Sequence, residues 1–159
     1  MNGHVTAAIV WVAIVIAGYF VIDHFSAPDP VVRTTQSGGY QITIPVARDG
    51  HFYLEGAING QQVTFLVDTG ASYVSVGSDV ARRANLPEGV TGVFSTANGS
   101  VEGRIVRRQS VRADVFEISG ISVAVMPGSS PYGLLGQNFL RHFSVSQSDG
   151  KLVLRMRQS

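Results

Sequence analysis

An apolar, β-forming run at residues 65–67 leads directly into Asp68-Thr69-Gly70. This pattern is typical of a buried strand that delivers a carboxylate into a tight turn. The hydroxyl of Thr69 can bond to backbone there, and Gly70 lets a neighbouring segment of chain come close. The three residue types are common, so an ordinary Asx turn at a strand end also explains this motif when it is taken alone.

A second motif lies about 65 residues downstream, at residues 132–140. It reads as a strand that ends in Leu134-Leu135-Gly136, followed by a short helix that contains Asn138-Phe139-Leu140. Taken alone, it describes a plain strand-to-helix junction.

Between the two motifs, Asn98-Gly99 is flanked by strand-like residues from Phe94 to Val101. Asn-Gly favours a two-residue hairpin turn, because a type I′ turn needs positive φ at both central positions. The sequence therefore predicts a β-hairpin here. Taken alone, the pattern is also explained by an ordinary surface hairpin without a functional role.

In kind and order, these three elements resemble those of retropepsin-like aspartic proteases (clan AA), most closely the bacterial membrane-anchored type. The resemblance covers residues 40–159. It implies an all-β, single-lobed acid protease barrel with short helices, in which Asp68 is catalytic and Thr69, Gly70 and Ala71 support the active site.

The resemblance also assigns roles to the other two elements. The hairpin corresponds to the flap that closes over bound peptide, so Ala97, Asn98 and Gly99 are expected at its substrate-binding tip. Leu135 and Gly136 are expected beside the catalytic loop, where the glycine must lack a side chain.

Two-lobed relatives of the pepsin type carry two Asp-Thr-Gly or Asp-Ser-Gly motifs, whereas this chain carries one. The resemblance therefore implies a homodimer that pairs Asp68 of each copy and hydrolyses peptide bonds with an activated water. No metal or other cofactor is implied. The alternatives are a catalytically silent, membrane-tethered peptide-binding or scaffold module of the same fold, and an unrelated β-barrel with a ligand pocket.

The chain departs from viral retropepsins at two positions. Those enzymes often carry an Asp after Asp-Thr-Gly-Ala and an Arg after the later Gly, which pair near the dimer interface. Here the positions hold Ser72 and Gln137. A different interface must hold the dimer, for which the Lys151–Met156 strand is a candidate.

The N-terminus differs from the rest of the chain, because Val5 to Ile22 is an 18-residue run without a charge. As a helix it spans about 27 Å, enough for a bilayer core. A cleaved signal peptide is the alternative, although no Lys or Arg precedes the run and it exceeds the usual apolar length. We predict a membrane anchor at residues 1–25, with residues 5–22 in the bilayer, a linker at 26–39 and the protease domain at 40–159.

The resemblance implies a single-pass protein of the bacterial inner membrane with its catalytic domain in the periplasm. The charge pattern says little about sidedness, since only Arg33 lies near the span.

Other features of the domain agree with a β-barrel. Alternating segments predict strands at residues 40–46, 51–58, 62–67, 73–76, 100–107, 111–118 and 121–125, and a closing hairpin at 143–156. A helix is expected from Ser78 to Asn85, with Ser78 as its N-cap. The net charge of +1 does not indicate nucleic-acid binding, and the chain has no cysteine.

Overall fold

The computed structural model describes residues 12, 15–16, 31–36, 39–96 and 99–157. From residue 31 onward, the described part of the chain forms eleven strands and two short helices. The strands are β1 (Val32–Gln36), β2 (Gly39–Pro45), β3 (Tyr53–Ile58), β4 (Gln61–Val67), β5 (Val74–Gly77), β6 (Val90–Thr96), β7 (Gly99–Ala113), β8 (Phe116–Met126), β9 (Gly133–Leu135), β10 (Phe143–Ser148) and β11 (Lys151–Met156). The helices are α2 (Ser78–Arg83) and α3 (Gln137–Leu140).

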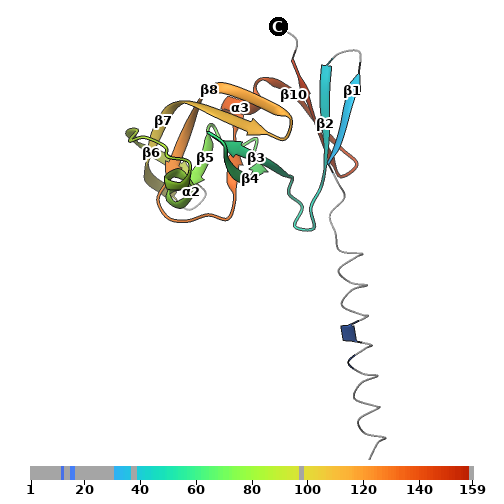
Figure 1. Cartoon of the computed structure of the whole chain (residues 1–159), viewed down its shortest axis with the longest axis horizontal. Coiled ribbons are helices and arrows are strands. Elements are labelled where there is room, and N and C mark those ends of the chain that lie inside the picture. Colours follow the sequence, from blue (N-terminus) through green and yellow to red (C-terminus); the bar gives the residue numbers. More distant parts are fainter. Residues whose placement is uncertain (1–11, 13–14, 17–30, 37–38, 97–98, 158–159) are drawn as a thin grey trace, which may run out of the picture.

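The strands form two sheets that stand side by side (Figure 1). The larger sheet has the order β3-β4-β9-β5-β8-β7-β6, and β3 also pairs with β7, which closes six of its strands into a barrel. The smaller sheet has the order β1-β2-β11-β10. The expected all-β barrel with short helices is therefore confirmed.

Two-residue turns with positive φ connect several of the hairpins. Asn59 and Gly60 have φ of 48° and 84° between β3 and β4, and Asp149 and Gly150 have φ of 49° and 68° between β10 and β11. Asn, Asp and Gly are the residues that tolerate this backbone region. Local turn chemistry thus sets the register of both hairpins.

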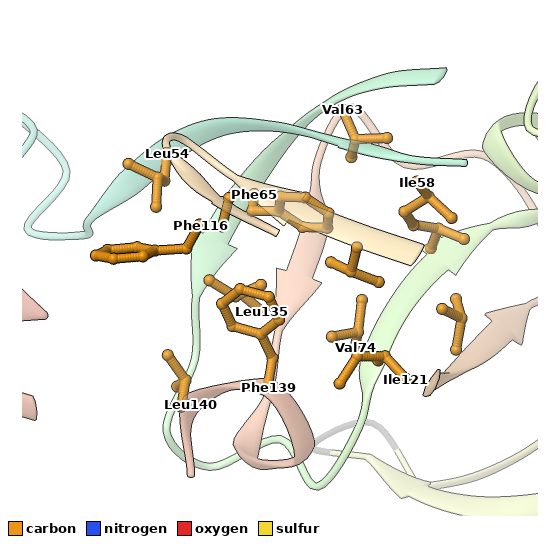
Figure 2. Close-up of a cluster of buried hydrophobic side chains, with 14 of the residues drawn as sticks. Leu54, Ile58, Val63, Phe65, Val74, Phe116, Ile121, Leu135, Phe139 and Leu140 are labelled. Carbon is orange, nitrogen blue, oxygen red and sulfur yellow. The ribbon is translucent and has the colours of Figure 1, made fainter. Parts of the chain in front are cut away.

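The barrel interior is filled with large apolar side chains (Figure 2). Phe65 of β4, Leu135 of β9 and Phe139 of α3 are fully buried there. Phe143 of β10 joins the two sheets, because its ring lies 4.8 Å from that of Phe116 and 5.3 Å from that of Phe139, centroid to centroid.

The strands from Gly99 onward differ from the expected segments at two places. The predicted strand 111–118 is broken by a turn at Asp114, which has φ of 52° and binds Arg33 through both carboxylate oxygens. The predicted break after Arg107 is instead a bulge within β7, where the Gln109 amide bonds to Asn59 and to the carbonyl of Arg107. The turn at Asp114 involves a contact with the distant Arg33, and the bulge in β7 involves a contact with the distant Asn59. Neither contact is visible in the local sequence pattern.

The helix also differs at its ends. Gly77, not Ser78, is the N-cap residue, with φ of −70° and ψ of 162°. The Ser78 hydroxyl donates to the carbonyl of Met126 at 3.0 Å, so it is not available for capping. The helix ends at Arg83, before the predicted Asn85, whose φ is 50°.

The smaller sheet involves two segments that the sequence analysis singled out. β1 lies inside the predicted linker 26–39 and pairs with β2 along its length. β11 lies between β2 and β10, so both of its backbone edges are already used within the chain. Any contact of the Lys151–Met156 strand with a second copy would therefore be made by its side chains, and its part in a dimer interface stays a prediction.

Most of the predicted anchor at residues 5–22 lies outside the described residues. Val12, Val15 and Ile16 are described, and they are helical and exposed. No helix in the described part of the chain is long and apolar enough to cross a membrane.

Candidate active site

Asp68 lies immediately after β4, at the point where this strand runs parallel to β9. Val67 is in register with Leu135, and the Asp68 amide donates to the Leu135 carbonyl at 3.2 Å. Leu135 is fully buried and Phe65 of β4 is as well, so the start of the Asp-Thr-Gly loop is attached to the centre of the core.

The loop after β4 is a tight turn that fixes the Asp68 carboxylate. The Ala71 amide donates to the Asp68 carbonyl at 3.3 Å, and the Gly70 amide donates to Asp68 Oδ1 at 2.8 Å. A Cβ on residue 70 would lie 3.2 Å from that same oxygen, so glycine leaves the carboxylate room. Asp68 is half-buried, while Thr69 is exposed.

Gly136 allows β9 and α3 to lie directly against this loop. A Cβ at position 136 would lie 2.3 Å from the carbonyl oxygen of Tyr73 and 2.8 Å from that of Ala71. The backbone after Gly136 then binds the loop, because the Gln137 amide donates to Ala71 and the Asn138 amide to Ser72, at 2.8 and 3.1 Å. This close approach distinguishes the site from an isolated Asx turn.

Two side chains of α3 complete the attachment. Gln137 Nε2 donates to the carbonyl oxygen of Thr69 at 2.9 Å. Asn138 accepts from the Val74 amide at 2.8 Å and donates to the Ser122 carbonyl at 2.7 Å, which ties α3 to β5 and β8. Sequence reasoning gave neither residue a role, and a polar pair directly after Gly136 was the available signal.

A cleft of about 500 Å³ lies next to the Asp-Thr-Gly loop. All of the described residues that line it are uncharged. They are Gly70, Ala71, Ser72, Tyr73, Ser75, Val93, Phe94, Ser95, Thr96, Ala124, Met126 and Leu134. Asp68 is not among them, but the two residues that follow Thr69 are. The cleft therefore lies beside the loop that carries Asp68, and the described residues around it place no charge on its wall.

Strand β6 of the β6–β7 hairpin forms one wall of this cleft. The ring of Phe94 in β6 meets the ring of Tyr73 edge to face, with 6.4 Å between centroids and an interplanar angle of 86°. Thr96 pairs with Gly99, whose φ is 106°, so the predicted hairpin is confirmed. The expected tip residues Ala97 and Asn98 lie outside the described residues.

The structure thus brings Asp68, Thr69, Gly70 and Ala71 together with Leu135 and Gly136. Gly99 lies at the base of the hairpin tip. No group of three His, Asp or Glu side chains that could hold a metal ion occurs in the part of the chain that the structure describes.

Three comparisons with known proteins agree with this geometry. The family model described as "gag-polyprotein putative aspartyl protease" matches residues 54–142. The crystal structure of a retropepsin-like aspartic protease from Rickettsia conorii matches with a TM-score of 0.63 and 27% identity, over 79% of this chain and 95% of that one.

Two curated proteins are similar in sequence, and both are described as uncharacterized. RP867 of Rickettsia prowazekii (strain Madrid E) is 29% identical over 117 residues, which cover 72% of this chain and 50% of the relative. A protein of Sinorhizobium sp., from the cobV 5′ region, is 26% identical over 120 residues, 73% of this chain and 52% of the relative. The chain thus spans about half the length of each of these relatives.

The family match covers more than half of the chain and includes Asp68, Gly136 and the hairpin between them. On this match and on the fold, the chain belongs to the gag-type, retropepsin-like family of aspartic proteases.

Proposed function

We propose that this protein is an aspartic endopeptidase that acts as a homodimer, with Asp68 of each copy forming one catalytic pair. The observation that carries this proposal is the attachment of a single Asp-Thr-Gly loop to β9 and α3, beside an uncharged cleft. A loop that is hydrogen-bonded at Asp68, Thr69, Ala71 and Ser72 holds its carboxylate in one orientation before substrate binds.

The pair works because two carboxylates about 3 Å apart cannot both be ionised cheaply, so they share one proton. The charged carboxylate takes a proton from a water, which attacks the carbonyl carbon of the peptide bond. The neutral carboxyl group donates to the carbonyl oxygen and stabilises the tetrahedral intermediate. A proton then passes to the leaving nitrogen, and the C–N bond breaks.

The cleft supports a peptide as the substrate. Its lining combines apolar side chains such as Phe94, Met126 and Leu134 with hydroxyl groups and backbone. An extended segment with uncharged side chains fits this surface, because it buries apolar groups and finds hydrogen-bond partners along the flap.

The test is hydrolysis of denatured proteins or a peptide library by the full chain and by Asp68→Asn. The amide keeps the shape of the carboxylate but cannot act as base, so activity should disappear while the fold is kept. Glu88→Gln is the matched control, since it makes the same chemical change at an exposed position outside the cleft. An active Asp68→Asn enzyme would remove Asp68 from the mechanism.

If the wild-type chain is an enzyme, Asp68→Asn should lose cleavage but still bind peptides. Wild-type chain that binds peptides but cleaves none would favour the alternative, a silent binding module. The homodimer is tested separately, because activity at low enzyme concentration should rise faster than linearly if only the dimer is active.

We further propose that residues 5–22 anchor the chain in the bacterial inner membrane, with the protease domain in the periplasm. The uncharged 18-residue run supports the anchor. A C-terminal alkaline phosphatase fusion should be active and a reporter restricted to the cytoplasm inactive. The reverse pattern would place the domain on the cytoplasmic side.

A further inference from the structure

The smaller sheet has one face in the core and one face turned outward. Ile42 of β2 and Leu154 of β11 are opposite each other and fully buried. Side chains alternate between the faces along each strand, and residues paired across strands share a face. Thr43, Val153 and Ser146 therefore form an outward row across β2, β11 and β10.

The charges of this sheet all have one sign. Its four strands contain three basic residues and no acidic residue. Arg33 shares the face of the buried residues and binds Asp114. Lys151 and Arg155 lie on the outward face and are exposed. Arg157 follows two residues later, is also exposed, and continues the ladder through its amide. Three cations thus share the outward face.

These three cations are not neutralised within the described part of the chain. None of them forms a salt bridge there, not even with Asp149 in the adjacent turn. Arg155 donates from Nε and Nη2 to Gln41 Oε1, at 3.2 and 2.8 Å, which orients the guanidinium group but leaves its charge. The net charge of the whole chain is only +1, so the positive charge of this face is a local feature.

The connection to the proposed anchor keeps this sheet close to the bilayer. The predicted bilayer segment ends at Ile22 and β1 begins at Val32, so the chain between them reaches at most about 35 Å. This connecting segment contains Asp23 and Asp29 but no Lys or Arg. Any attraction to an anionic membrane must therefore come from the folded domain.

We propose that the outward face of the smaller sheet lies against anionic lipid headgroups of the membrane that holds the anchor, with Lys151, Arg155 and Arg157 contacting phosphates. This inference rests on the proposed anchor but not on the side of the membrane. Each basic residue near an anionic surface strengthens binding about fivefold, so three give on the order of 100-fold. That is enough for a domain already held nearby by its anchor.

The other features of the face fit a lipid surface better than a second copy of the chain. Two copies stacked through this face would bring like charges together, which is unfavourable. The serine and threonine hydroxyls between the cations can donate to phosphate oxygens. Strand β6, which lines the cleft, lies at the opposite end of the molecule (Figure 1). A docked domain therefore keeps its cleft open to substrates from the water.

Fluorescence quenching tests the orientation of the full chain in vesicles. The chain contains no cysteine, so a single engineered thiol carries the dye. Ser148→Cys places it on the outward face, and Val93→Cys places it on β6, and both positions are exposed. The vesicles contain a headgroup-attached quencher in phosphatidylcholine, with or without phosphatidylglycerol.

We expect strong quenching at Ser148 and little at Val93, only when phosphatidylglycerol is present. Salt at about 0.5 M should relieve the quenching, since it screens charges within a few ångströms. Equal quenching at both positions, or quenching that ignores lipid charge and salt, would overturn the proposal. No quenching in any vesicle would also overturn it and leave the face to a protein partner.

Charge removal gives an independent test with a matched control. Lys151→Gln with Arg155→Gln should lower the ratio of docked to undocked domain about 25-fold. Arg82→Gln with Arg107→Gln makes the same charge change at exposed positions of α2 and β7, and should leave the ratio nearly unchanged. If both pairs act equally, net charge rather than this face is responsible, and the proposal is wrong.

Flotation of the same samples separates this inference from the anchor. A chain that floats with vesicles lacking phosphatidylglycerol, in high salt, is anchored. If it floats there but Ser148 is never quenched, only the docking face is wrong. If it floats only with phosphatidylglycerol and at low salt, the anchor is wrong, and loss of flotation in Lys151→Gln with Arg155→Gln would still support the face.

Discussion

Gln137 Nε2 lies 2.9 Å from the carbonyl oxygen of Thr69, so the first residue of α3 binds the centre of the Asp-Thr-Gly loop. At the position where viral retropepsins often carry an arginine, this chain uses a neutral amide that acts inside its own protomer. We therefore expect Gln137 to position Asp68 through the loop.

Gln137→Met, which keeps the length of the side chain but removes the donor, should lower kcat about three- to tenfold, the effect of one net hydrogen bond. KM should change little, because Gln137 does not line the cleft. Steady-state kinetics on one peptide substrate separate the two constants. A change confined to KM would show that the residue contacts substrate instead.

Gly136→Ala should disrupt both stability and activity. The new Cβ would lie 2.3 Å from the Tyr73 carbonyl, and backbone on both sides leaves it no room to shift. Gly92→Ala in β6 is the matched control, since its nearest atom lies at 3.9 Å. Thermal unfolding and activity should be close to wild type for Gly92→Ala and strongly reduced for Gly136→Ala. Equal behaviour of the two variants would contradict the close packing at Gly136.

Asn138→Ala removes one acceptor and one donor that join α3 to β5 and β8. It leaves the amide of Val74, a fully buried residue, without its partner, which costs about 1–3 kcal/mol of unfolding free energy. Asn138→Asp keeps the acceptor for Val74 and loses only the donor to Ser122, so its loss should be smaller. Denaturant unfolding of both variants measures the difference, and a larger loss in Asn138→Asp would contradict these assignments.

The turns and the strand that leads into Asp68 could be predicted from sequence, because neighbouring residues determine them. Asn59-Gly60 and Asp149-Gly150 set turns by their own backbone preferences, and Asp68-Thr69-Gly70 follows a strand that its apolar run defines. The break at Asp114, by contrast, occurs with a contact to Arg33, 81 residues away. The roles of Gln137 and Asn138 were missed for the same reason, since their partners lie 68 and 64 residues away.

A pH effect is expected at the loop between β2 and β3. The Tyr53 hydroxyl donates to Asp49 Oδ2 at 2.6 Å. This bond to a carboxylate, together with desolvation, raises the pKa of Tyr53 to about 12. Because the folded pKa is raised, the contribution to stability is complete below pH 10 and is lost as pH rises toward 12.

Ultraviolet titration of tyrosinate checks this. In wild type Tyr53 should ionise late, and in Asp49→Asn its pKa should move back toward the ordinary value of about 10. Tyr53→Phe should lack the late phase altogether. A late phase that persists in Tyr53→Phe would assign it to another tyrosine.

Ala71 provides a test of how the loop sets the pH range of catalysis. Pepsin-like enzymes usually place Ser or Thr at this position, where the hydroxyl donates to the outer oxygen of the catalytic carboxylate and favours its charged form. Ala71 cannot donate, although its amide still closes the turn by bonding to the Asp68 carbonyl at 3.3 Å. The wild-type profile should therefore be bell-shaped with an optimum at roughly pH 4.5–6.5. Ala71→Ser should move both limbs of the profile toward acid while the turn is kept. An optimum below about pH 3 in wild type, or no shift in a folded Ala71→Ser enzyme, would show that other groups set the profile.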